Sequence, residues 1–120
     1  MAKFEETFAA LKGLLDPYVS RLHVTTDAPT AYMLDGEYAP AINRPMFFAG
    51  VRAGRAYVSF YLMPVYSNPE LMGRISDPLR RRLHGKSCFN FTRPEPELFD
   101  ELRGLVRNGF DCYERLGYVK

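Results

Sequence analysis

Hydrophobic residues recur with the period of a helix at both ends of the chain. Near the N-terminus this spacing predicts an amphipathic helix with one buried face, which consists of Phe4, Phe8, Leu11, Leu14 and Leu15. Asp16-Pro17 follows. Because proline lacks the backbone donor that a helix interior uses, we expect the helix to end or restart there. Glu97–Leu116 is the longest predicted helix, and its apolar side is formed by Leu98, Leu102, Leu105, Val106, Tyr113 and Leu116.

Two glycines lie inside this C-terminal helix. Gly104 and Gly109 each weaken a helix by about 1 kcal/mol relative to alanine. We expect close packing of the helix on the sheet to compensate for that loss, because a glycine lets two backbones approach each other.

Between the two helices the pattern becomes that of β-strands. Alternating or β-branched runs bounded by turn residues predict strands over residues 22–26, 31–34, 45–50, 56–64 and 87–91. The strongest signal is the aromatic pair Pro45–Gly50 and Ala56–Pro64. A short glycine-containing connection between two such runs predicts an antiparallel hairpin. The stretch Asp35–Arg44 contains glycine, proline and asparagine and is interpreted as a loop.

Two short helices are predicted after the hairpin, over Asn68–Ile75 and Asp77–His84, because each begins with a capping residue next to a proline. Gly85 is predicted to cap the end of the second. The order of elements indicates a single α+β domain over residues 1–120. We expect a mostly antiparallel sheet of about five strands, with the N- and C-terminal helices on one face and the two short helices between the last strands.

Composition and charge narrow the possible classes of protein. With 47% hydrophobic and 25% charged residues the chain is an ordinary globular domain. Its net charge of +2 is too small to indicate nucleic-acid or membrane binding. No apolar run suits a secretory signal or a bilayer-spanning helix, and two cysteines are too few for a disulfide scaffold. We therefore expect a cytoplasmic protein with reduced thiols that is a monomer or a homodimer.

Alternation along the strands assigns side chains to two faces of the sheet. Val58, Phe60 and Leu62 share one face with Phe89 and Phe91, and this apolar set is expected to pack beneath the terminal helices. The opposite face and its edge carry the candidate ligand-binding residues, which are Tyr57, Tyr61, Met63, Tyr66, Lys86, Cys88 and Asn90.

Tyrosines suit a partly hydrated binding surface because each has a large apolar body and a polar tip. This second face could be a ligand cleft roofed by the Asp35–Arg44 loop and by the helices within Asn68–His84, or it could be a dimer surface. Alternatively, the short helices simply cover it and the tyrosines form local hydrogen bonds.

His84 and Cys88 are candidates for a Cys–His pair, because a thiolate nucleophile needs a nearby base and a lowered pKa. Lys86 and the run Arg80-Arg81-Arg82 could lower the pKa of Cys88. The competing interpretation is a structural histidine beside an inert cysteine, and we assign no catalytic residue.

No metal site or cofactor is predicted. A zinc site would need His23, His84, Cys88 and Cys112, which lack the usual paired spacings. Carboxylates near the helix starts could bind a hard cation weakly, although the helix dipole already explains their position. The basic cluster could contact phosphate but accompanies no nucleic-acid motif, and it consists of Arg74, Arg80, Arg81, Arg82 and Lys86.

Three strings carry a family resemblance: Pro45-Met46-Phe47-Phe48, the run Ala56–Tyr66, and Gly85-Lys86-Ser87-Cys88-Phe89-Asn90-Phe91. They resemble a bacterial YdhG-like domain of unknown function, and the likeness spans about Phe4 to Tyr118. The resemblance implies a compact domain similar to frataxin, with terminal helices against an antiparallel sheet. It also implies a connection with iron, because at least one member of the wider family is linked to iron delivery for iron–sulfur assembly.

Three functions therefore stand as expectations. The first is a non-catalytic module that binds a small ligand or a protein partner through the tyrosine-bearing face. The second, which comes from the resemblance, is iron binding or delivery through helix carboxylates. The third is an enzyme that depends on Cys88.

Overall fold

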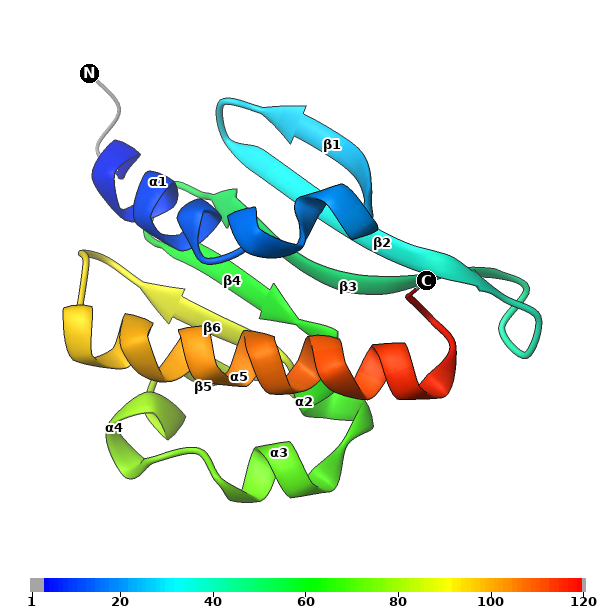
Figure 1. The fold of residues 1–120 in the computed structure, drawn as a ribbon. Helices are drawn as coiled ribbons and strands as arrows, with labels where there is room; N and C mark the ends of the chain where they lie inside the picture. Colours follow the sequence, from blue (N-terminus) through cyan, green and yellow to red (C-terminus); the bar gives the residue numbers. More distant parts are fainter. Residues whose placement is uncertain (1–3, 120) are drawn as a thin grey trace.

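A six-stranded antiparallel sheet forms the centre of the computed structural model, which describes residues 4–119 (Figure 1). The strands are β1 His23–Ala28, β2 Ala31–Ala39, β3 Arg44–Ala53, β4 Val58–Leu62, β5 Leu83–His84 and β6 Cys88–Phe91. Their order across the sheet is β1-β2-β3-β4-β6-β5. This confirms the expected α+β class and adds one short strand, β5, to the predicted set.

The helices are α1 Glu5–Gly13, the 3₁₀ helix η1 Asp16–Arg21, α2 Met63–Ser67, α3 Pro69–Gly73, α4 Asp77–Arg80 and α5 Pro96–Leu116. Figure 1 shows α1, η1 and α5 on one face of the sheet, with α3 and α4 beside α5. The predicted restart at Pro17 is confirmed, because η1 has this proline in its first turn. The predicted apolar face is confirmed as well, since Val58, Phe60 and Leu62 are fully buried.

The loop predicted over residues 35–44 is wrong, because β2 continues to Ala39 and β3 begins at Arg44. Only residues 40–43 connect the two strands. Pairing between the two long strands outweighs the preference of glycine, proline and asparagine for turns. The β2–β3 register shifts between Leu34 and Asp35 and again between Asp35 and Tyr38, so the strands stay paired on both sides of Gly36. Gly36 is required there, because a Cβ would collide with the backbone oxygen of Tyr118.

Two predicted boundaries near the short helices are also wrong. The strand predicted over Ala56–Pro64 spans only Val58–Leu62. Pro64 lies in the first turn of α2, where a proline is well tolerated. The second predicted short helix ends at Arg80, and Leu83–His84 pairs with β6. Gly85 therefore caps no helix; it lies in the β5–β6 turn with φ +70°.

Helix α5 docks on a β-bulge in β3. Leu34 pairs with Ala49 whereas Asp35 pairs with Phe47, so Phe48 is an extra residue in the ladder. The Phe48 ring lies 5.4 Å from the Tyr113 ring of α5, and the Tyr113 hydroxyl donates a hydrogen bond of 2.7 Å to the Phe47 carbonyl oxygen. The bulge therefore supplies both an apolar knob and a polar anchor for α5.

Tyr113→Phe should lower the free energy of unfolding by about 1 kcal/mol near neutral pH, because the partly buried Phe47 carbonyl oxygen loses its donor. Burial raises the pKa of Tyr113 above its ordinary value. The hydroxyl group therefore favours the folded state below about pH 10, and this contribution falls as the pH rises further, by about 1.4 kcal/mol per pH unit. Urea denaturation from about pH 7 to pH 11 should show the wild-type and Tyr113→Phe stabilities converging. A constant difference across that range would contradict the prediction.

The two glycines of α5 have different surroundings. A Cβ on Gly109 would lie 2.8 Å from Cβ of Pro64 in α2, whereas a Cβ on Gly104 would meet no atom of the described part of the chain within 4 Å. The expected close approach is therefore confirmed at Gly109, although its neighbour is a helix rather than the sheet. At Gly104 the expectation is wrong.

These surroundings predict opposite effects for the same substitution. Gly104→Ala should stabilise the protein by about 0.5–1 kcal/mol, because it restores helix propensity in open space. Gly109→Ala should destabilise it by about 1–3 kcal/mol, because the added methyl group overpacks the α2–α5 contact. Equilibrium denaturation of the two variants measures both values, and equal effects of the two substitutions would refute the assigned packing.

Candidate functional site

The sheet face opposite α1 and α5 is the open face, since no helix among the described residues crosses it (Figure 1). Strand register places two rows of side chains next to each other on this face. The first row is Met33, Gly50, Tyr61, Cys88 and His84. The second row is Ala31, Arg52, Ser59 and Asn90.

Asn90 joins the two rows through hydrogen bonds. Its Oδ1 accepts a bond of 2.7 Å from the Ser59 hydroxyl group and one of 3.3 Å from Sγ of Cys88. Both bonds use the carbonyl oxygen of the amide, so its NH₂ group keeps donor capacity toward a ligand. Ser59 is only 6% exposed, and this pairing therefore holds the Asn90 side chain at a fixed place on the sheet.

A hollow of about 350 Å³ adjoins these residues, and it is lined by Arg52, Gly54, Arg55, Ala56, Tyr57, Ser59 and Tyr61. Tyr57 is 44% exposed, so much of its ring faces solvent. Among residues 4–119, no ion pair involves Arg52 or Arg55. The hollow therefore combines uncompensated positive charge with aromatic rings and hydroxyl groups.

Four of the predicted binding residues come together on or beside the open face. Tyr61, Cys88 and Asn90 lie in the two rows, and Tyr57 lines the hollow next to Tyr61. Sequence alternation assigned Tyr61, Cys88 and Asn90 to this face correctly because β4 and β6 are regular strands, whereas Tyr57 directly precedes β4. Arg52 belongs with them, and its place opposite Ser59 could have been found from the register of the predicted hairpin.

The other three predicted residues lie elsewhere. Met63 begins α2 and packs against the hydrophobic core, because the chain leaves the sheet at that point. Tyr66 of α2 and Lys86 of the β5–β6 turn form a separate contact, with the Lys86 Nζ 5.0 Å from the centre of the Tyr66 ring. Neither residue lines the hollow.

Two of the alternatives for this face, a roofed cleft and a face covered by the short helices, are wrong. Residues 35–44 mostly extend β2 and β3, and the short helices are attached to α5 on the other side of the sheet. There the Ser76 backbone N–H and hydroxyl group donate hydrogen bonds of 2.8 and 2.5 Å to the Glu101 carboxylate. Because Glu101 lies on α5, these bonds hold the start of α4 away from the open face.

Cys88 is a poor candidate for a nucleophile. Burial raises the pKa of its thiol, and a hydrogen bond with Ser59 lowers the pKa only in part. His84 is its partner across the β5–β6 ladder, yet the thiol donates to Asn90. Two of the nearby arginines bond elsewhere, Arg82 to the Glu95 carboxylate at 2.9 Å and Arg80 to backbone carbonyls.

Alkylation by iodoacetamide tests the state of this thiol. Because only the thiolate reacts quickly, Cys88 should react more slowly near neutral pH than the same residue in urea-unfolded chain, with a midpoint at higher pH. Ser59→Ala should raise that midpoint further, because it removes a hydrogen bond that favours the thiolate. Mass spectrometry of the Cys88 peptide gives the rates. Rapid labelling below pH 7 would contradict this and would favour the Cys-dependent enzyme.

The described residues include no group of three or more His, Cys, Asp or Glu side chains placed to hold a metal ion. None of the described helices has the length and apolar character needed to cross a bilayer.

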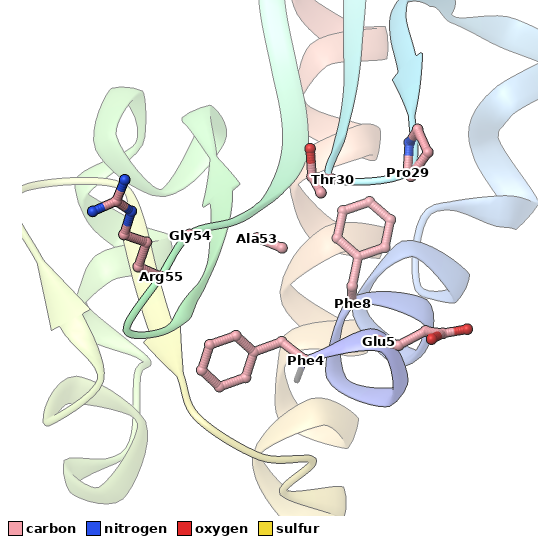
Figure 2. Close-up of a pocket in the computed structure, with 8 residues that line it drawn as sticks. All are labelled: Phe4, Glu5, Phe8, Pro29, Thr30, Ala53, Gly54 and Arg55. Carbon is pink, nitrogen blue, oxygen red and sulfur yellow. The ribbon is translucent and has the colours of Figure 1, made fainter. Parts of the chain in front are cut away.

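A second cavity, which sequence reasoning missed, lies at the start of α1 (Figure 2). This α1 cavity has a volume of about 650 Å³ and is lined by Phe4, Glu5, Phe8, Pro29, Thr30, Ala53, Gly54 and Arg55. Helical spacing indicated that Phe4 and Phe8 are buried. Nothing local indicated that two turns from distant parts of the sheet would leave a space beside them.

Comparison of the chain with protein-family models, curated proteins and solved structures finds no match. The likeness to YdhG-like domains therefore stays a prediction, and function is argued from the geometry of the open face.

Proposed function

We propose that this protein is a non-catalytic binding module whose open face holds a small ligand with a flat ring and an anionic group. One observation carries the proposal: Arg52 and Arg55 border an aromatic hollow and belong to no ion pair among residues 4–119.

We infer that the ligand carries an anionic group because hydrogen-bond donors are in excess on this face. A guanidinium group presents a planar fork of N–H donors that matches a carboxylate or a phosphate. The NH₂ group of Asn90 and the hydroxyl groups of Tyr57 and Tyr61 add further donors near the arginines. Within residues 4–119, no carboxylate side chain lines the hollow, so an anion would meet no repulsion from these walls.

We infer that the ligand also has a flat ring because the walls of the hollow are aromatic and the hollow is small. Tyr57 and Tyr61 offer ring surface for stacking, and an arginine plane can stack in the same way. A volume of about 350 Å³ lies at the small end of the range for ligand pockets, about 300–1,000 Å³. A ligand with one or two fused rings suits this volume better than a nucleotide or a folded partner.

The non-catalytic role is supported by Cys88, because burial favours the protonated thiol over the reactive thiolate. Iron binding through helix carboxylates, which the family resemblance implies, gains no supporting observation from the described residues. The open face is therefore the better basis for a function.

Naphthoate, a bicyclic carboxylate, is a suitable probe because the chain contains no tryptophan and naphthalene fluorescence can be excited selectively. Arg52→Gln should weaken binding of naphthoate about tenfold or more, because a charge-assisted hydrogen bond contributes roughly 1.5–3 kcal/mol. Tyr61→Ala should weaken it by a similar factor through loss of stacking and apolar contact. Fluorescence titration gives the dissociation constants.

Arg107→Gln is the matched control, because Arg107 is an exposed arginine on α5, on the other side of the sheet. It should leave naphthoate binding unchanged. Backbone amide shifts upon titration should be largest at Ser59, Tyr61 and Asn90. Equal affinities for the Arg52→Gln and Arg107→Gln variants, or shifts confined to another surface, would refute the proposal.

A further inference from the structure

The α1 cavity differs in chemistry from the hollow on the open face. We propose that it is a second binding site, which accepts a small neutral aromatic molecule. The second site does not depend on the function of the open face, since Gly54 and Arg55 of the β3–β4 loop are the only described residues that line both.

Apolar groups dominate the walls of the α1 cavity. Figure 2 shows the Phe8 ring directed toward the β1–β2 turn at Pro29 and Thr30, whereas the Phe4 ring is directed toward the side of the β3–β4 loop. Ala53 lies between Phe8 and that loop. The Pro29 ring forms part of the opposite wall. Thr30 also lines the cavity, but in Figure 2 its hydroxyl group points away from the two phenylalanine rings.

The charges at this cavity lie at its rim. In Figure 2 the carboxylate of Glu5 and the guanidinium group of Arg55 point outward, away from the two phenylalanine rings. A charged ligand would therefore lose water on entry without gaining a partner inside, which is unfavourable. Entry of a neutral ring is favourable, because it removes the apolar surfaces of both the ligand and the cavity walls from water.

An aromatic ligand fits the walls better than a flexible aliphatic one. The two phenylalanine rings can make edge-to-face or offset contacts with a third ring. The volume of about 650 Å³ lies well inside the range of about 300–1,000 Å³ that is usual for small-ligand pockets.

Backbone hydrogen bonds hold the cavity open. The Ala53 N–H donates to the Thr30 carbonyl oxygen at 2.8 Å, and the Gly54 N–H donates to the Tyr57 carbonyl oxygen at 2.9 Å. These bonds tie the two turns to the ends of the sheet, so neither turn can fold down onto Phe8 without breaking one. A site formed before the ligand arrives loses less conformational entropy on binding.

Naphthamide is the probe for this site, because it has the ring of naphthoate without the charge. Ala53→Leu should weaken naphthamide binding at least about tenfold, since the longer side chain fills the cavity. Ala53 pairs with the buried Val58, which places the new side chain on the helix-covered side of the sheet. Ala10→Leu makes the same change at an exposed position of α1 and should leave the affinity unchanged.

Ala53→Leu could lower the stability of the protein and so weaken binding indirectly. Changes in the backbone amide chemical shifts of the wild-type protein on titration locate the bound ligand without that variant. In the wild-type chain, naphthamide should shift the amides of Thr30, Ala53 and Gly54 and leave those of Ser59 and Asn90 in place. Arg52→Gln should not change the affinity for naphthamide, and Ala53→Leu should not change the affinity for naphthoate. A result that contradicts the proposal for one site therefore leaves the proposal for the other site testable. No saturable naphthamide binding, or binding that maps elsewhere, would overturn the inference.

Discussion

The docking of α5 on the bulge of β3 determines which face of the sheet is covered by helices and which face is available to bind a ligand. Phe48, the extra residue of the bulge, packs against Phe110 and Tyr113, and the Tyr113 hydroxyl group anchors the neighbouring backbone. The short helices then attach to α5, at Gly109 against Pro64 and at Glu101 against Ser76. Because all these contacts lie on one side, apolar burial is concentrated there and the other face remains open.

The side chains on the open face consequently lie outside the hydrophobic core. Apart from Met33, its two rows contain small or polar residues next to Tyr61. The Ser59–Asn90 hydrogen bond orders them without a covering helix from the described residues. The hollow and the α1 cavity lie on either side of the β3–β4 loop. One short connection therefore separates a donor-rich surface from an apolar one, and Arg55 borders both.

Several elements could be predicted from the sequence because their signals are local. The amphipathic terminal helices, the restart at Pro17 and the β3–β4 hairpin all follow from spacing and turn residues. The errors occur where distant contacts outweigh local preference. Cross-strand pairing carries β2 past Gly36, and the attachment of Pro64 to α5 turns the chain into α2 before Met63 can continue the strand.

For the candidate sites, the sequence by itself determined the orientation of side chains along regular strands, because a strand alternates its faces with a period of two residues. That period separated Tyr61 and Asn90 from the buried Phe60 and Phe89. Only the tertiary structure decided that the tyrosine-bearing face is open and that a cavity lies beside Phe8. Those features depend on how segments far apart in the chain meet, which no local period specifies.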